Sequence, residues 1–135
     1  MNAAVAATKT QRLTMHFCID IDDTITYFPR FFVALSKKLP DAKITIVTFR
    51  TDREASEKYL AEIGMRYDDL ILSSDDSQGK MDGQTLAAWK AGFVNSLKPD
   101  VFFEDMPEVV KLIDSKIVVF MPCDDIIREW IGKHS

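Results

Sequence analysis

Five short apolar runs recur along the chain, separated by segments with polar residues and helical spacing. The runs are residues 16–20, 43–48, 69–73, 100–104 and 116–121. Each of the first four precedes a stretch that can form a helix. Continuous apolarity, as in 44–47 and 101–103, is typical of strands covered on both faces. The pattern predicts an α/β fold: a single three-layer Rossmann-like domain with a five-stranded, mainly parallel sheet and helices on both faces.

The segments between these runs predict amphipathic helices. The expected helices are Phe28–Leu39, a segment capped by Thr51 or Asp52 that ends at Gly64, a segment after Gly83 whose apolar arc runs from Leu86 to Leu97, and Asp124–Ile131. We expect Phe31, Phe32 and Leu35 to lie in the core. In the last helix, Trp130 is expected to be a packing residue.

Composition narrows the classes of protein. At 135 residues the chain fits one domain, and a formal charge of −4 predicts no general nucleic-acid binding surface. Cys18 and Cys123 favour reduced thiols in a cytoplasmic protein over a secreted disulfide framework. No apolar run approaches the roughly 18 residues that a membrane span needs. Residues 1–14 read as a disordered tail, and 15–135 as the domain.

The end of the first run carries the main chemical signal. Asp20, Asp22, Asp23 and Thr24 place three carboxylates and a hydroxyl within five positions. Carboxylates this close repel one another, and burying one without a partner costs several kcal/mol, roughly. A hard divalent cation such as Mg²⁺ would compensate them, since it prefers oxygen ligands and often accompanies a phosphate. A plain Asp-Asp turn is the alternative.

Polar residues also end two other predicted strands. Thr48 and Arg50 close the second run, and Glu104 and Asp105 close the fourth. In an open α/β sheet the carboxyl ends of the strands line one edge, where ligands bind. We therefore expect these side chains to gather with Asp20.

The ordered set resembles the haloacid dehalogenase (HAD) superfamily of phosphohydrolases. Its first motif, Asp-x-Asp-x-Thr after an apolar strand, matches residues 20–24; its second matches Thr48, and its acidic pair matches Glu104 and Asp105. The resemblance spans about residues 16–121 and implies a HAD-like hydrolase domain. Small nucleotidase-like members are the nearest in pattern.

The third motif of that superfamily is a lysine, for which the sequence offers two residues. Lys90 lies about 40° around its helix from Leu86, within the apolar arc, so its ammonium should point toward the sheet. Side chains on a helix also lean toward its N-terminus. Lys80 lies in a loop nearer the expected edge. We favour Lys90 and keep Lys80 as a substrate-binding alternative.

The resemblance implies a Mg²⁺-dependent phosphomonoesterase. Asp20 would attack phosphorus, Asp22 would serve as general acid and base, Thr48 would donate to a phosphoryl oxygen, and the lysine would neutralise charge. Asp20, the backbone carbonyl of Asp22, Glu104 and Asp105 would hold Mg²⁺. Thr24 and Arg50 are assigned to the substrate side. Pairing of Arg50 with the acidic cluster is an equal alternative.

The short connections indicate what the substrate could be. Only 23 residues separate Thr24 from Thr48, which leaves no room for a cap domain. A site without a cap suits a nucleotide or an exposed phosphate on a larger molecule, or closure by a neighbouring subunit in a homo-oligomer. A catalytically silent HAD-fold domain that binds a phospho-ligand or a protein is the main alternative. A receiver domain is disfavoured by Ser73-Ser74 after the third run, and the full acid set favours phosphoryl transfer over dehalogenation.

Overall fold

The computed structural model describes residues 14–75, 85–122 and 125–134. Their elements are β1 (His16–Ile19), η1 (Ile21–Ile25), α2 (Pro29–Lys38), β2 (Lys43–Thr48), α3 (Arg53–Ile63), β3 (Asp69–Leu72), α4 (Leu86–Leu97), β4 (Val101–Phe103), α5 (Pro107–Val110), β5 (Val118–Phe120) and α6 (Asp125–His134). Residues 1–13 of the expected tail lie outside the described residues. Lys80 and Cys123 lie outside them too. Among the described ranges, no helix has the length and apolar character needed to cross a membrane.

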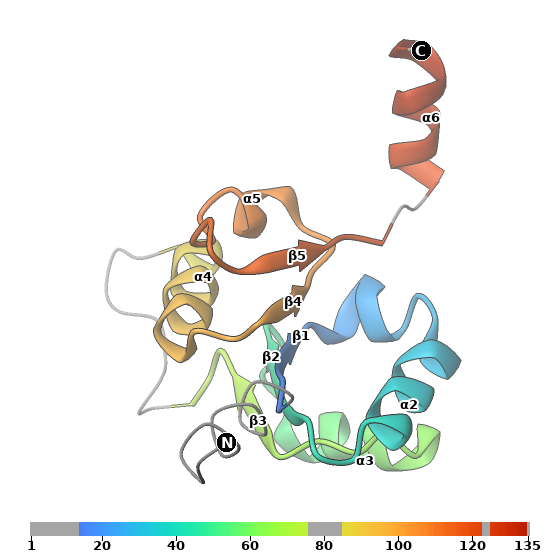
Figure 1. Ribbon diagram of the computed structural model, residues 1–135, viewed down its shortest axis with the longest axis vertical. Coiled ribbons are helices and arrows are strands. Elements are labelled where there is room, and N and C mark those ends of the chain that lie inside the picture. Colours follow the sequence, from blue (N-terminus) through green and yellow to red (C-terminus); the bar gives the residue numbers. More distant parts are fainter. Residues whose placement is uncertain (1–13, 76–84, 123–124, 135) are drawn as a thin grey trace, which may run out of the picture.

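The five strands form one all-parallel sheet in the order β3-β2-β1-β4-β5 (Figure 1). β1 is central, with Phe17 in register with Ile44 of β2 and with Val101 of β4. The prediction of a single α/β domain of Rossmann-like type is confirmed. The chain moves outward from β1 to β3 and then returns to β4, so the strand order reverses beside β1. Ligands bind at such a switch point.

Two apolar clusters cover the sheet. On one side, residues of α2 and α3 such as Phe32 and Leu60 pack on Ile19 and Ile46 of the central strands. On the other side, Trp89 and Val94 of α4 and Val109 of α5 pack with Cys18, Val47 and Phe102. The alternation of side chains along each strand divides neighbours such as Cys18 and Ile19 between the two faces. This gives the three layers that the continuous apolar runs predict.

Local signals set the ends of the helices. The Asp52 side chain accepts a hydrogen bond from the Ala55 N–H at the start of α3, and Gly64 ends this helix at φ 77°. Thr85 caps α4 in the same way through the Ala88 N–H, at 3.0 Å. Pro29 opens α2, where its missing N–H costs nothing. The predicted boundaries of α3 and of the apolar arc in α4 therefore agree with the structure.

Two of the expected packing residues are exposed. Phe32 is buried, but Phe31 retains 46% of its surface, because it extends past the central strands toward β4 and β5, where no described helix covers this face. Trp130 retains 59%, because α6 runs away from the sheet instead of lying on it (Figure 1). The expectation that Phe31 is core is wrong, and Trp130, expected to be a packing residue, contacts the His134 ring of its own helix but does not pack on the sheet.

Candidate functional site

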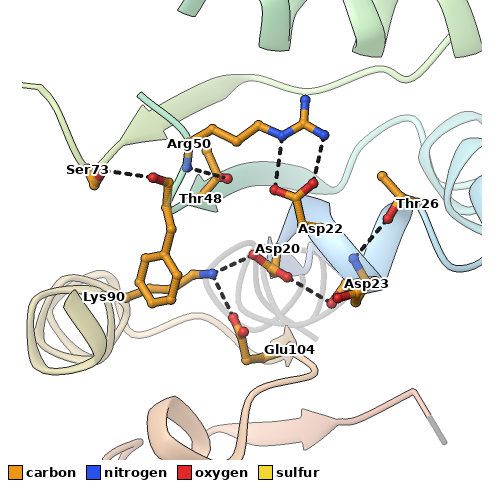
Figure 2. Close-up of polar contacts among 11 residues, drawn as sticks. Asp20, Asp22, Asp23, Thr26, Thr48, Arg50, Ser73, Lys90 and Glu104 are labelled. Carbon is orange, nitrogen blue, oxygen red and sulfur yellow. Dashed lines mark hydrogen bonds and ion pairs between the residues drawn. The ribbon is translucent and has the colours of Figure 1, made fainter. Parts of the chain in front are cut away.

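The candidate site lies at the carboxyl edge of the sheet, where β1, β2 and β4 end (Figure 2). Asp20 follows β1 directly, and its N–H donates to the Phe103 carbonyl at 3.0 Å, which extends the β1–β4 pairing. Glu104 follows β4, and Thr48 ends β2. The parallel topology thus brings together residues 84 positions apart.

Asp20 is held by two donors from different elements. The Lys90 ammonium lies 2.5 Å from Oδ1, and the Thr24 hydroxyl donates to Oδ2 at 3.0 Å. Asp20 is 4% exposed and Thr24 is fully buried. Both contacts fix the orientation of the carboxylate, as a nucleophile would require.

Lys90 is buried completely between the two acidic strand ends. Its Nζ also lies 2.9 Å from Glu104 Oε2, and it sits over the Phe49 ring, 4.4 Å from the centroid. The side chain reaches the edge because residues on α4 lean toward the N-terminus of the helix. Of the two lysines that the sequence offers, the structure places Lys90 in the site, whereas Lys80 lies outside the described residues.

The electrostatics of the site show an excess of negative charge. One ammonium faces Asp20 and Glu104, with Asp105 beside them. Burial raises the pKa of Asp20 to about 6 and that of Glu104 to about 8, because the lysine compensates only part of the lost hydration. A second positive charge would therefore be favourable here.

The acidic residues fit a hard divalent cation. One carboxylate oxygen each from Asp20, Glu104 and Asp105 lie within 4.8 Å of one another, beside a cavity of about 100 Å³. Glu104 Oε2 is buried, and its positive partner is the Lys90 ammonium at 2.9 Å, which also faces Asp20. An all-oxygen set of three carboxylates, of which two share a single ammonium, suits Mg²⁺. The side chain of Asp22 is not in this set, and the role of its carbonyl stays a prediction.

Asp22 instead forms a bidentate pair with Arg50. Arg50 Nε and a terminal guanidinium nitrogen donate to the two carboxylate oxygens at 3.0 and 2.8 Å. These hydrogen bonds lower the pKa of Asp22. Arg50 also lies over the Tyr59 ring, 5.4 Å from its centroid. The structure thus shows Arg50 paired with the acidic cluster, and its contact with a substrate phosphate stays a prediction.

The irregular turn η1 explains how these residues are presented. Asp22 is extended and Asp23 is left-handed at φ 60°, a conformation that Asp tolerates better than most residues. The Asp23 N–H donates to the Thr26 hydroxyl at 2.8 Å, which closes the turn. The turn directs Thr24 back toward Asp20 and leaves Asp22 facing outward.

The end of β2 supplies further support. The buried Thr48 hydroxyl accepts the Arg50 N–H at 3.1 Å and retains its own proton as a donor. Ser73 donates to the Phe49 carbonyl at 2.9 Å and so fixes the residue on which Lys90 rests. Sequence reasoning did not assign Phe49 or Ser73 to the site. Their signal was only their position at the carboxyl ends of adjacent strands.

Comparisons with known proteins give a likeness of fold. No family model and no curated protein matches the chain. Two solved chains are similar, each with a TM-score of 0.62: one from the Pnkp1/Rnl/Hen1 complex at 14% identity, and one from the Pnkp1/Rnl/Hen1 RNA repair complex at 16%. Each match covers 81% of this chain but only 46% and 42%, respectively, of the solved chains. The protein thus spans less than half the length of these structures.

Proposed function

We propose that this chain is a Mg²⁺-dependent phosphomonoesterase that acts through an aspartyl-phosphate on Asp20. The observation that carries the proposal is the buried Asp20 carboxylate, held between Lys90 and Thr24 with Glu104 and Asp105 beside it. A carboxylate fixed in this way, next to a place for positive charge, suits attack on an electron-rich phosphate. The order of the motifs along the chain supports the same chemistry.

In the first displacement, an oxygen of Asp20 forms a bond to phosphorus as the bond from phosphorus to the ester oxygen breaks. Asp22 gives a proton to the departing oxygen, which leaves as an alcohol. Lys90 balances the charge on the phosphoryl oxygens, and the Thr48 hydroxyl donates to one of them. The second displacement reverses the proton transfer: Asp22 removes a proton from water, water oxygen bonds to phosphorus, and the bond to Asp20 breaks.

Asp20, Glu104 and Asp105 would hold the magnesium ion, which would supply positive charge against the phosphate oxygens. Without that charge, the acidic residues would repel the substrate. The single ammonium that Asp20 and Glu104 share and the raised pKa values of both carboxyl groups support this assignment.

The role of Asp22 requires Arg50 to change partner. While Arg50 holds both Asp22 oxygens, the carboxyl stays ionised and cannot give a proton. A substrate phosphate offers the guanidinium an equivalent bidentate acceptor. Substrate binding would then release Asp22 to turn toward the ester oxygen.

We propose a nucleotide or a nucleic-acid end as the substrate class. The predicted lack of a cap domain suits a phosphate on a larger molecule. Both solved neighbours come from a Pnkp1/Rnl/Hen1 complex, in one case described as an RNA repair complex. Hydrolysis of phosphates at nucleic-acid ends would fit such an assembly. Membership in an assembly of this kind would also give this chain protein partners.

Phosphate release tests the proposal directly. The purified chain is assayed with p-nitrophenyl phosphate, nucleotides and 3′- and 5′-phosphorylated oligonucleotides, with Mg²⁺ or EDTA. Asp20→Asn should reduce turnover by roughly a thousandfold or more. Asp23→Asn is the matched control, since Asn also tolerates the left-handed conformation and should keep most of the activity. Turnover that survives in Asp20→Asn would contradict the mechanism.

A phospho-ligand-binding domain without catalysis is the second candidate. The observation that favours it is the Asp22–Arg50 pair, which withholds the only proposed proton donor. In that case, calorimetry should detect Mg²⁺-dependent binding of the same oligonucleotides, while no phosphate is released from any of them.

A further inference from the structure

One half of the sheet is bare on a single face. In β5, Val118 and Phe120 retain 52% and 54% of their surface, whereas Val119 between them packs with the cluster under α4 and α5. Side chains alternate along a strand, so the exposed pair shares the face on which α2 and α3 cover the other strands. Strands of parallel sheets are normally covered on both faces. Beside β5, this cover is missing from the described residues.

An apolar groove lies over this bare half and continues onto α2. Its volume is about 380 Å³, and Tyr27, Phe28, Phe31, Phe103, Phe120 and Pro122 line it. Successive ring contacts make its floor continuous: centroids lie 6.4 Å apart for Phe28 and Phe31, 6.3 Å for Phe31 and Phe103, and 5.6 Å for Phe103 and Phe120. An exposed aromatic patch of this kind marks an interaction site.

The same chain also has an exposed amphipathic helix. In α6, Trp130 retains 59% and the adjacent Ile131 49% of their surface, and the rest of the helix carries charges such as Arg128, Glu129 and Lys133. One face of the Trp130 ring stacks on His134 of the same helix, at 4.3 Å between centroids. The helix begins at Asp125, three positions after Pro122 of the groove, yet it extends away from its own sheet (Figure 1).

We propose that two copies of this chain form a dimer by exchanging α6, so that the helix of each copy lies in the groove of the other. A helix of 10 residues is about 15 Å long and fits along a sheet of short strands. Because α6 points away from its own groove, a second copy can satisfy both apolar surfaces at once. Reciprocal exchange makes the interface two-fold symmetric, and each contact then occurs twice.

The area agrees with a specific dimer. Tyr27, Phe28, Phe31, Phe120 and Trp130 are each about half exposed. An aromatic side chain presents about 150–250 Å², so burying these five removes about 500 Å² from water per contact. Two such contacts bury about 1,000 Å², and Val118 and Ile131 add to this. That reaches the lower limit of about 1,000 Å² for specific interfaces.

Sedimentation velocity of the full chain tests the exchange, independently of any enzymatic activity. The wild type should be a dimer at about 100 µM, a concentration well above a Kd in the micromolar range. Trp130→Glu and Phe120→Glu should each give monomers. Leu112→Glu is the control, since Leu112 is also exposed, at 44%, but lies outside the groove. All of these positions are exposed, so circular dichroism should show that the variants fold.

A mixing experiment distinguishes exchange from any other dimer. Trp130→Glu and Phe120→Lys should each be monomeric alone. In their mixture one contact joins an intact helix to an intact groove, and the other brings the introduced carboxylate against the introduced ammonium, so heterodimers should form. A wild-type chain that stays monomeric overturns the proposal. In that case, protection of Trp130 from a fluorescence quencher would indicate that the chain's own α6 occupies the groove. Weaker nucleotide binding by the groove variants would indicate that substrate occupies it. A dimer that survives both glutamate variants also overturns it.

Discussion

Replacing Lys90 by Met should destabilise the metal-free protein in a pH-dependent way. The ammonium is fully buried between Asp20 and Glu104, at 2.5 and 2.9 Å. Removing one partner of a buried ion pair costs about 3–5 kcal/mol in unfolding free energy, because a buried charge is left uncompensated. At pH 8 we expect a loss of about this size. At pH 5 both carboxyl groups of the variant are neutral in the folded state, so the loss should be much smaller.

Urea unfolding in EDTA at pH 5 and pH 8 measures this difference. The control is Lys43→Met, which removes an exposed lysine 3.9 Å from Asp69 and should cost at most about 1 kcal/mol. Mg²⁺ should restore part of the stability of Lys90→Met at pH 8, since a bound cation replaces the missing positive charge. Turnover should fall by about a hundredfold or more in Lys90→Met and be retained in Lys80→Met. A loss at pH 8 below about 1 kcal/mol, or equal losses at both pH values, would refute the reasoning.

Two further predictions concern the same site. The metal-free wild type should lose stability as pH rises from about 4 to about 8, because the raised pKa values of Asp20 and Glu104 make the folded state bind more protons than the unfolded state in this window. Thermal unfolding in EDTA should show this decline and Mg²⁺ should reduce it; a flat profile in EDTA would contradict it. Replacing Arg50 by Met should move the alkaline limb of the kcat/KM profile to higher pH, because this profile reports the free enzyme, in which Asp22 loses the hydrogen bonds that lower its pKa. An unmoved limb would mean that Arg50 does not control the proton donor.

The sequence predicts the sheet and the inward orientation of Lys90 well, because both depend on the periodicity of apolar residues. Continuous apolar runs are typical of parallel strands, and the carboxyl ends of such strands share an edge. The position of Lys90 on the apolar arc of its helix predicts that it points inward, and the structure places it between the acidic strand ends. These inferences need only the helical and strand periods.

The partners of surface groups could not be predicted in the same way. The sequence allowed Arg50 either a ligand or an acidic residue, since both offer the same bidentate acceptor, and the choice of Asp22 depends on the three-dimensional course of η1. The apolar stripe of α6 predicts that the helix packs against another apolar surface, but it does not specify which surface. The burial of Phe31 was predicted wrongly for a related reason. The apolar arc of a helix indicates which side faces the sheet, but it does not indicate how much of that side is covered.

The parallel strand order also determines when the site can form during synthesis. Asp20 follows β1, Asp22 lies in η1 and Arg50 follows β2, so all three emerge from the ribosome early. Lys90 and Glu104 follow 70 and 84 residues after Asp20. At about 5–20 residues per second, the acidic turn waits several seconds or more for its counter-charge. For that interval the nascent chain carries these acidic residues without their lysine, and the candidate site forms only when β4 has joined the first half of the sheet.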